Sequence, residues 1–442
     1  MKKTLEEWLA LQESVHPKTI DLGLARVSSV ARALHIDEPA CPVITVGGTN
    51  GKGSTVTHIE AFLRAGGVTT GMFTSPHFIR YNERICVNGE QVADAELVSA
   101  FERIEGARGN TTLTFFEFNA LAALLIFADR SVQSMVLEVG LGGRLDAANL
   151  VDADVGVVCS IGFDHRDWLG DTLELIGAEK AGIFRSGRPA VLGTSEMPRS
   201  VFATIETVGA QPIVAGKDFT WQVQGKQWEY RGLRQTLRGL PPSALAGAIQ
   251  YRNASTALAA VEALDPRRLG AAFGMDERSV TRALGMVRLA GRFQVVAGSA
   301  DSADSGRSAG SGPGEWILDI AHNEPAAKIF AEHVKQRPLP AARGRTVAVV
   351  GILGDKDALE IVSALQPLVD HWFLCSLPGP RGGSASQLAQ RLGRVSSDRV
   401  TLADSVAQAC EAARAATGPA DRVLIFGSVY TVGPALQWLK IY

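Results

Sequence analysis

A glycine-rich loop offers the clearest chemistry in the sequence: Gly47-Gly48-Thr49-Asn50-Gly51-Lys52-Gly53-Ser54. It follows a short β-branched run at 42–46 and precedes apolar residues at helical spacing between 56 and 63. A strand, a glycine loop and a helix in this order predict a cradle of backbone N–H groups for phosphates. Lys52 would then reach the β- and γ-phosphates, and Ser54 would help to hold Mg²⁺. The strict G-x-x-x-x-G-K-[ST] pattern is not met, because Gly53 separates Lys52 from Ser54.

Charged side chains stand at or beyond the ends of other predicted strands. Glu138 lies in the apolar run 135–139, and Asp164-His165 follows the apolar run 155–161. These residues are candidates for a ligand site, because α/β proteins bind ligands at the carboxyl ends of their strands. Taken alone, Glu138 is explained equally well by an ion pair with an arginine. Taken alone, Lys180 is explained better as a solvated helix lysine.

The elements that position these residues form two α/β regions. The first contains the strands named above, helical patterns such as 119–129, and a small antiparallel hairpin at 219–233. The second begins after about residue 293, with strands expected at 316–321, 346–353, 372–377 and 422–429 and helices at 325–336, 385–392 and 404–416. We therefore predict an α/β protein with an N-terminal P-loop-type ATPase domain, built on a mostly parallel sheet with a small antiparallel sheet, and a C-terminal Rossmann-like domain. The predicted domains are 1–291 and 292–442, with a flexible insertion at 298–314 rich in Gly, Ser, Ala and Asp.

Composition excludes several partners. The 442 residues include 44 Lys and Arg against 46 Asp and Glu, so the net charge of −2 disfavours nucleic acid. The longest apolar stretch, 120–128, is much shorter than the ~18 residues of a membrane span. The five cysteines are scattered and form no C-x-x-C pair, which argues against a disulfide scaffold or a structural zinc site. We expect a monomeric cytoplasmic protein with no nucleic-acid or membrane partner.

Twelve ordered motifs resemble the Mur ligase superfamily and, within it, the bifunctional dihydrofolate synthase/folylpolyglutamate synthase family. They are HPKTIDLGLARV (16–27), VGGTNGKGST (46–55), TSPHFIRYNERICVNG (74–89), TFFEF (114–118), LEVGLGGRLDAAN (137–149), SIGFDHRDWLG (160–170), AEKAGIFR (178–185), NASTAL (253–258), GRFQ (291–294), LDIAHN (318–323), GDKD (354–357) and FGSVYTV (426–432). The phosphate loop of this family has the form G-T-N-G-K-G-[ST], which accounts for the departure from the strict pattern. The resemblance implies an ATP-dependent amide ligase that adds L-glutamate to 7,8-dihydropteroate and to reduced folates through an acyl phosphate, with ATP as co-substrate and two Mg²⁺ per site.

The resemblance also implies a role for each matching residue. Lys52, Lys180 and His322 would be catalytic, and His322 and Ser428 would orient glutamate. The implied ATP contacts are Thr49, Asn50, Gly51, Lys52, Gly53, Ser54, Asn253, Arg292 and Asp319. The implied metal ligands are Ser54, Ser75 and Glu138 for one Mg²⁺, and His165 with a carboxylated Lys180 for the other.

Three segments resemble those that hold the pterin in bifunctional members. They are Asp21, Leu22, Gly23 and Leu24; Thr114, Phe115, Phe116 and Glu117; and Leu145, Asp146 and Ala147. Phe116 would offer a stacking face and Asp146 an acceptor for pterin N–H groups.

A monofunctional folylpolyglutamate synthase is the alternative. A peptidoglycan Mur ligase is disfavoured, because only 46 residues precede Gly47, too few for a UDP-sugar domain of roughly a hundred residues. A nucleotide switch without ligase chemistry would have no reason to keep Lys180, Arg292 and Asp319 together.

Overall fold

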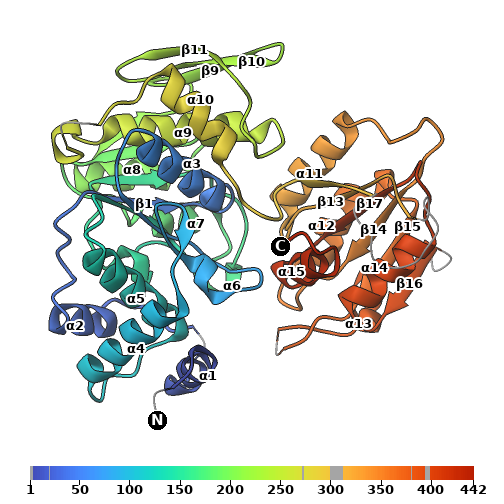
Figure 1. Cartoon of the computed structure of the whole chain (residues 1–442), viewed down its shortest axis with the longest axis horizontal. Helices are drawn as coiled ribbons and strands as arrows, with labels where there is room; N and C mark the ends of the chain where they lie inside the picture. The colour runs from blue at the N-terminus through green and yellow to red at the C-terminus, as the bar shows by residue number, and fades with distance from the viewer. Residues whose placement is uncertain (1–2, 19, 271–272, 299–311, 380, 394–398) are drawn as a thin grey trace. The chain divides into compact units, whose positions relative to one another are not determined.

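The chain divides into two compact units in a computed structural model. The structure describes every residue except 1–2, 19, 271–272, 299–311, 380 and 394–398. The first unit comprises Met1–Ala244 and Ile249–Arg288, and the second comprises Leu245–Ala248 and Leu289–Tyr442 (Figure 1). Most of the predicted insertion at 298–314 lies outside the described residues.

The first unit is built on an eight-stranded sheet with the order β4-β3-β2-β5-β1-β6-β7-β8. Its strands are β1 (Val43–Gly47), β2 (Thr70–Phe73), β3 (Ile85–Val87), β4 (Glu90–Gln91), β5 (Ser134–Glu138), β6 (Val155–Val158), β7 (Pro189–Leu192) and β8 (Gln211–Val214). The neighbouring strands in the series β2-β5-β1-β6-β7-β8 pair in parallel, whereas the β2–β3 and β3–β4 pairs are antiparallel. The predicted mostly parallel sheet is confirmed.

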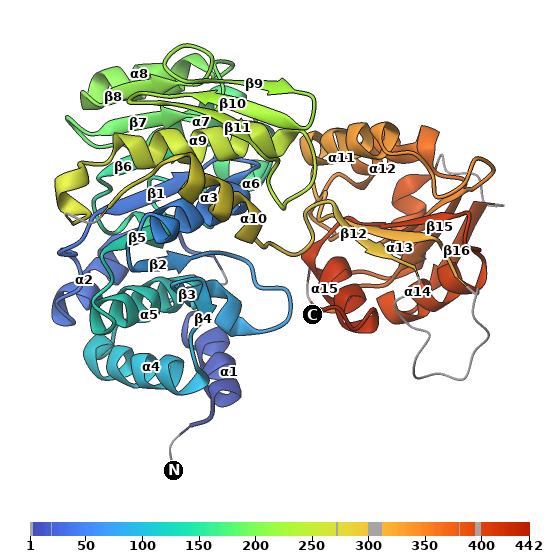
Figure 2. The same cartoon turned by 45° about the horizontal axis from the view of Figure 1, so that its top comes forward.

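Helices cover both faces of this sheet (Figure 2). They are α1 (Leu5–Val15), α2 (Ala25–Ala33), α3 (Lys52–Ala65), α4 (Asp94–Arg108), α5 (Phe115–Asp129), α6 (Arg166–Leu169), α7 (Leu173–Ala181), α8 (Arg199–Val208), α9 (Ile249–Ala263) and α10 (Glu277–Met286). The helix α3 packs on β1, β2 and β5 and against α9 and α10. An apolar core joins Phe73, Val43 and Leu137 of the sheet to α5, whose own residues 118–127 are all buried. An all-round apolar helix of this kind is typical of a buried position.

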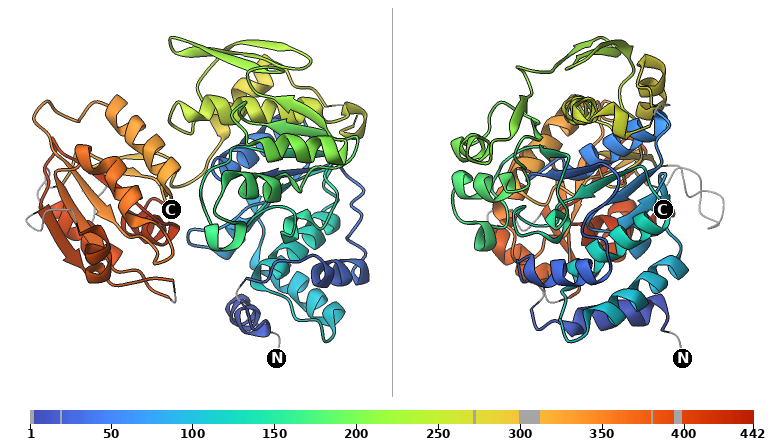
Figure 3. Two further views of the ribbon diagram at one scale, coloured as in Figure 1. Left: turned by 180° about the vertical axis from the view of Figure 1, so that it is seen from behind. Right: turned by 90° about the vertical axis from the view of Figure 1, so that its left-hand side faces the viewer.

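A three-stranded antiparallel sheet adds to the first unit, seen from behind in Figure 3. It consists of β9 (Thr220–Gln224), β10 (Gln227–Arg231) and β11 (Thr236–Leu240). The sequence predicts only the β9–β10 hairpin, because β11 contains a glycine and alternates weakly. Tyr230 attaches the sheet to α9, since its buried Oη donates a hydrogen bond of 3.0 Å to Glu262 Oε2.

The second unit is a doubly wound α/β fold, which confirms the Rossmann-like prediction. Its strands are β12 (Gln294–Ala297), β13 (Glu315–Leu318), β14 (Thr346–Val350), β15 (His371–Cys375), β16 (Val400–Ala403) and β17 (Arg422–Phe426), in the order β12-β13-β17-β14-β15-β16. All pairs are parallel except β12–β13. Its helices are α11 (Glu324–Gln336), α12 (Ala358–Leu365), α13 (Ala385–Leu392), α14 (Val406–Ala415) and α15 (Val429–Trp438). Residues of α11, α12 and α13 share one core with the sheet, whereas α14 contacts β14 and β15 and α15 contacts β17.

A short segment of the chain, Leu245–Ala248, belongs to the second unit although both flanking stretches belong to the first. Gly247 lies directly against His333 of α11, because a Cβ at this position would stand 2.3 Å from the imidazole Cε1. Only a residue without a side chain allows this approach.

A buried ion pair joins strands β13 and β17 of the second unit. Arg422 Nε donates a hydrogen bond of 2.6 Å to Glu315 Oε1, and the side chains are 2% and 8% exposed. Arg422 also donates to the carbonyl oxygens of Arg337 and Pro338. The guanidinium therefore satisfies a carboxylate and two carbonyl groups at once.

Among the residues outside the gaps given above, no helix is long and apolar enough to cross a membrane.

Replacing Arg422 with methionine should destabilise the second unit by about 3 kcal/mol, because the buried Glu315 loses its buried cation and keeps only Arg337, whose side chain is 40% exposed. Urea denaturation monitored by circular dichroism measures the loss. The matched control is Lys328→Met, which removes an exposed partner of Glu324 on α11 and should change stability little. Similar small losses in both variants would contradict the importance of the buried pair.

Candidate active site

The phosphate loop connects β1 to α3 and is fixed by the loop that follows β6. Thr49 N donates to Ser160 O at 2.7 Å, and Thr49 Oγ1 donates to Gly162 O at 3.0 Å. Asn50 N donates to Ser160 Oγ at 3.3 Å. Lys52 Nζ donates to the carbonyl oxygens of Gly48 and Thr49 at 3.0 and 3.2 Å. The loop that leads into α3 is thus fixed by hydrogen bonds to residues that follow the adjacent strand β6.

The turn at Gly51 requires glycine for two reasons. Its φ is +90°, a region that other residues rarely adopt. A Cβ at Gly51 would also lie 3.0 Å from Oδ1 of Asn253, a buried residue of α9. This contact places Asn253 beside the phosphate loop, although the two are far apart in sequence.

Two of the predicted metal ligands lie next to each other at the ends of adjacent strands. Glu138 is the last residue of β5 and is 4% exposed, and the backbone N–H of Ser75 donates to its Oε2 at 3.2 Å. Ser54, which is 3% exposed, lies in the first turn of α3. One carboxylate and two serine hydroxyls are oxygen ligands of the kind that Mg²⁺ prefers.

Lys180 is a buried lysine near the phosphate loop. It lies in α7 and is 4% exposed, and burial lowers its pKa to about 7, assisted by the nearby charge of Lys52. Asp164 and Asp146 are close enough to oppose this shift. The solvated-helix interpretation of Lys180 is therefore wrong. An amine with so low a pKa is partly neutral near pH 7, which carboxylation by CO₂ requires.

His165 directly precedes the short helix α6 and follows Asp164 in the loop after β6. Its Nε2 lies 3.9 Å from Asp164 Oδ1, and its side chain is about one-third exposed. The described side chains contain no group of three or more His, Cys, Asp and Glu that could hold a metal. A metal at this end of the sheet would therefore depend on serine hydroxyls and on the modified lysine as well. With these groups included, the donors would be oxygen atoms and one imidazole nitrogen, and such a set fits Mg²⁺.

The remaining ATP and glutamate candidates lie in the second unit. Asp319 directly follows β13, and its carboxylate accepts hydrogen bonds from the backbone N–H groups of Phe293 and Ala321 at 2.8 and 2.9 Å. Burial raises the pKa of Asp319, and the nearby Arg292 opposes the rise. Ser428, 2% exposed, caps α15 after the neighbouring strand β17. Gly427 N donates to Ile320 O at 2.9 Å, so the strand ends that carry His322 and Ser428 are adjacent.

The third pterin segment forms a tight turn at the end of β5. Asp146 is 3% exposed, and its two carboxylate oxygens accept hydrogen bonds from the backbone N–H groups of Leu141 and Ala148 at 2.8 and 2.9 Å. Burial raises its pKa to about 6, although these hydrogen bonds lower it. Leu145 and Ala147 flank it in the same turn. Asp146 is therefore mostly ionised near pH 7.

Arg26, which sequence reasoning missed, has its partners in the first and second of the predicted pterin segments. Thr114 caps α5, with Phe115, Phe116 and Glu117 in its first turn, and Asp21 to Leu24 precede α2. Arg26 NH2 donates to Glu117 Oε1 at 3.1 Å and to the Asp21 carbonyl at 2.7 Å. Nothing in the local pattern of the sequence marks Arg26 for this role.

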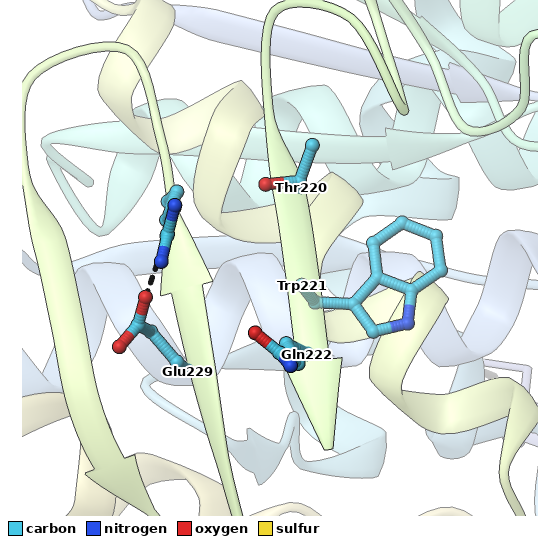
Figure 4. Close-up of a pocket in the computed structure, with 5 residues that line it drawn as sticks. Thr220, Trp221, Gln222 and Glu229 are labelled. Atoms are coloured by element: carbon cyan, nitrogen blue, oxygen red, sulfur yellow. Dashed lines mark hydrogen bonds and ion pairs between the residues drawn. The ribbon is translucent and has the colours of Figure 1, made fainter. Parts of the chain in front are cut away.

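A shallow hollow on the small sheet lies apart from all of these residues in the chain. Thr220, Trp221, Gln222, Glu229 and Arg231 line it (Figure 4). Arg231 Nε donates to Glu229 Oε1 at 2.6 Å, so its charge is already paired. None of the site residues predicted from the sequence lines this hollow.

Comparison with known proteins identifies the family. A model of the Mur ligase middle domain matches residues 46–197, and a model of the Mur ligase glutamate ligase domain matches residues 291–429. The dihydrofolate synthase/folylpolyglutamate synthase of Escherichia coli strain K12 is 41% identical over 433 residues, which are 98% of this chain and 95% of the relative. The chain belongs to the dihydrofolate synthase/folylpolyglutamate synthase family of Mur ligases.

Solved structures of this family match both units. Escherichia coli FolC in complex with DHPP and ADP has a TM-score of 0.88 and 40% identity, covering 99% of this chain and 98% of that chain. A bifunctional folylpolyglutamate synthase/dihydrofolate synthase with Mn, AMPPNP and L-glutamate bound has a TM-score of 0.87 and 37% identity, covering 99% and 98%. The resemblance read from the twelve motifs and the predicted fold class are confirmed.

Replacing Gly51 with alanine should raise the KM for ATP by about tenfold or more, because a left-handed backbone costs a side-chain-bearing residue about 1–2 kcal/mol and the new Cβ displaces Asn253. Steady-state rates at varied ATP measure the change. Gly106→Ala is the control and should leave the KM unchanged, because Gly106 is exposed in the last turn of α4 and a Cβ there would meet no atom within 4 Å. An unchanged KM in Gly51→Ala would show that the turn does not shape the nucleotide site.

Proposed function

We propose that the chain is an ATP-dependent ligase that adds L-glutamate to 7,8-dihydropteroate, giving dihydrofolate, and adds further glutamates to reduced folates. The observation that carries the proposal is the buried Lys180 beside the phosphate loop, in a chain that matches bifunctional relatives over nearly its whole length. A nucleotide switch needs a phosphate loop but has no use for a buried lysine with a lowered pKa.

The reaction needs activation, because a carboxylate is a poor electrophile and an ammonium group is not a nucleophile. Transfer of the γ-phosphoryl group of ATP to the substrate carboxylate gives an acyl phosphate and ADP. The neutral amine of glutamate then attacks the acyl carbon, and inorganic phosphate leaves as the amide forms. Phosphoryl transfer depends mainly on positioning and on neutralising charge.

The residues of the first unit meet both needs. We assign the phosphates of ATP to the backbone of Thr49 to Ser54 and to Lys52, with Asn253 beside the loop as a further contact. In the second unit, Arg292 and Asp319 would add nucleotide contacts, and His322 and Ser428 would orient glutamate. Support comes from the adjacent strand ends that carry the last two residues and from the relative with AMPPNP and L-glutamate bound.

We assign two Mg²⁺ ions to the site, which would neutralise the phosphate charge that builds up during transfer. Ser54, Ser75 and Glu138 would hold one ion, and His165 with a carboxylated Lys180 the other. Carboxylation replaces a buried cation by two oxygen ligands, which offsets the cost of burying Lys180. The relative solved with Mn supports a divalent metal.

Use of dihydropteroate distinguishes this proposal from a monofunctional folylpolyglutamate synthase. The pterin residues would be Asp21 to Leu24, Thr114 to Glu117 and Leu145 to Ala147. The ionised carboxylate of Asp146 suits pterin N–H donors, and the ring of Phe116 suits the pterin face. We further propose that the protein acts as a monomer in the cytoplasm, in accord with its five free cysteines, four of them buried.

An ADP-release assay tests the function. Wild-type protein given ATP, Mg²⁺ and L-glutamate should release one ADP for each dihydrofolate formed when dihydropteroate is present, and should also turn over with tetrahydrofolate. Omitting glutamate should remove sustained release. Turnover with tetrahydrofolate but not with dihydropteroate would establish the monofunctional alternative, and ADP release without glutamate would indicate a nucleotide switch.

Replacing Lys180 with alanine should lower kcat by orders of magnitude, because it removes the carbamate that would hold the second metal. Added short carboxylates such as acetate should restore part of the rate, and they should not increase the rate of wild-type protein. Steady-state kinetics measures both effects. Wild-type rates in Lys180→Ala would contradict the role assigned to the carbamate.

A further inference from the structure

The segment 16–24 forms no helix or strand among its described residues, yet it carries the first group of proposed pterin residues. Such a segment holds one conformation only where side chains fix it, because ordering each residue costs about 1–2 kcal/mol. Two side chains supply the fixing contacts. His16 Nδ1 lies 2.9 Å from Thr112 Oγ1, and His16 Nε2 lies 3.2 Å from Asp21 Oδ2. The second side chain is Arg26.

Arg26, in the first turn of α2, holds Asp21 by two atoms. Its NH1 donates to Asp21 Oδ2 at 2.7 Å, and its NH2 donates to the Asp21 carbonyl at 2.7 Å. Oδ2 of Asp21 therefore has both Arg26 and His16 as partners. Desolvation raises the pKa of the Asp21 carboxyl, but the charges of Arg26 and Lys18 and the hydrogen bond with His16 together lower it below its ordinary value. Asp21 is thus engaged within the protein and acts on the substrate through the shape of its segment.

The same guanidinium reaches the second pterin segment. Arg26 NH2 donates to Glu117 Oε1 at 3.1 Å, and Glu117 is 4% exposed. The other oxygen of Glu117 accepts the backbone N–H of Thr114 at 2.7 Å, which completes the cap of α5. A buried carboxylate needs a cation, and Arg26 provides it.

The first turn of α5 in turn contacts the strand end that leads to the third segment. The ring of Phe116 lies so close to Gly140 that a Cβ there would stand 2.6 Å from Phe116 Cζ. Leu141, the next residue, donates its N–H to Asp146. A continuous chain of contacts therefore runs from Asp21 through Arg26, Glu117 and Phe116 to the turn of Asp146.

We propose that Arg26 is a positioning residue for the pterin-bearing substrate: by joining Asp21 to Glu117, it sets the distance between the segment 20–24 and the first turn of α5. The inference rests on the proposed function, which assigns these segments to the pterin. A planar guanidinium with several donors in a fixed geometry can hold a carbonyl and two carboxylates together, and a lysine amine cannot do so as well.

Three variants test the inference, with initial rates at varied dihydropteroate and saturating ATP and glutamate. Arg26→Met should raise the KM for dihydropteroate by about tenfold or more, because small misplacements of substrate-positioning groups have large effects, and the KM for ATP should stay unchanged. Arg26→Lys should raise it too, while keeping the positive charge beside Glu117. The control, Arg32→Met, removes an exposed arginine of the same helix and should behave as wild type.

The third variant, Arg26→Met with Glu117→Gln, separates positioning from charge compensation. Glutamine still completes the cap of α5, so the double variant should recover most of the melting temperature lost in Arg26→Met. Its KM for dihydropteroate should remain raised. A KM that returns to the wild-type value together with stability would overturn the inference, as would an unchanged KM in Arg26→Met.

Wild-type turnover is measured first. Its absence with dihydropteroate would overturn the proposed function, and this inference with it. Wild-type turnover combined with an unaltered KM in both single variants at Arg26 would overturn this inference alone.

Discussion

Parallel pairing of β2, β5, β1 and β6 is the constraint on which the rest of the first unit depends. The register aligns Phe73 with Leu137, Val46 with Glu138, and Gly47 with Val158. Four strands therefore end at one edge of the sheet, where Glu138 is the last residue of β5 and where Ser75, the phosphate loop and the 160–165 loop follow the other three strands. A shift of one residue in any pair would turn every side chain of that strand to the opposite face.

Burial of charge at this edge carries a desolvation cost. The backbone N–H of Ser75 donates to Glu138, those of Leu141 and Ala148 donate to Asp146, and Lys180 lies near another cation. Buried titratable groups with shifted pKa values, such as Asp146 and Lys180, are concentrated at the functional sites of proteins. The second unit shows the contrasting case, since the buried Arg422 is paired with Glu315 and bonded to two carbonyl groups.

The sequence predicts elements with strong periodicity well and contacts across the fold poorly. The helix expected at 385–392 coincides with α13, and the strands expected in the second region all exist. β11 and β12 were not predicted, because short exposed strands lack a clear alternation. The phosphate loop and Glu138 can be found from local pattern, whereas Lys180 needs burial to distinguish it from a surface lysine. Arg26 and Glu117 are 91 residues apart, and no local pattern links them.

The placement of Leu245–Ala248 in the second unit has a consequence for synthesis on the ribosome. These residues emerge long before α11, which carries the His333 that Gly247 abuts. Their contact with α11 can therefore form only after a further stretch of chain, which includes α9 and α10 of the first unit, has been made. A product truncated after Arg288 contains the whole first unit together with four residues of the second, and a fragment starting at Leu289 lacks those four residues, so no single cut divides the chain into two complete units.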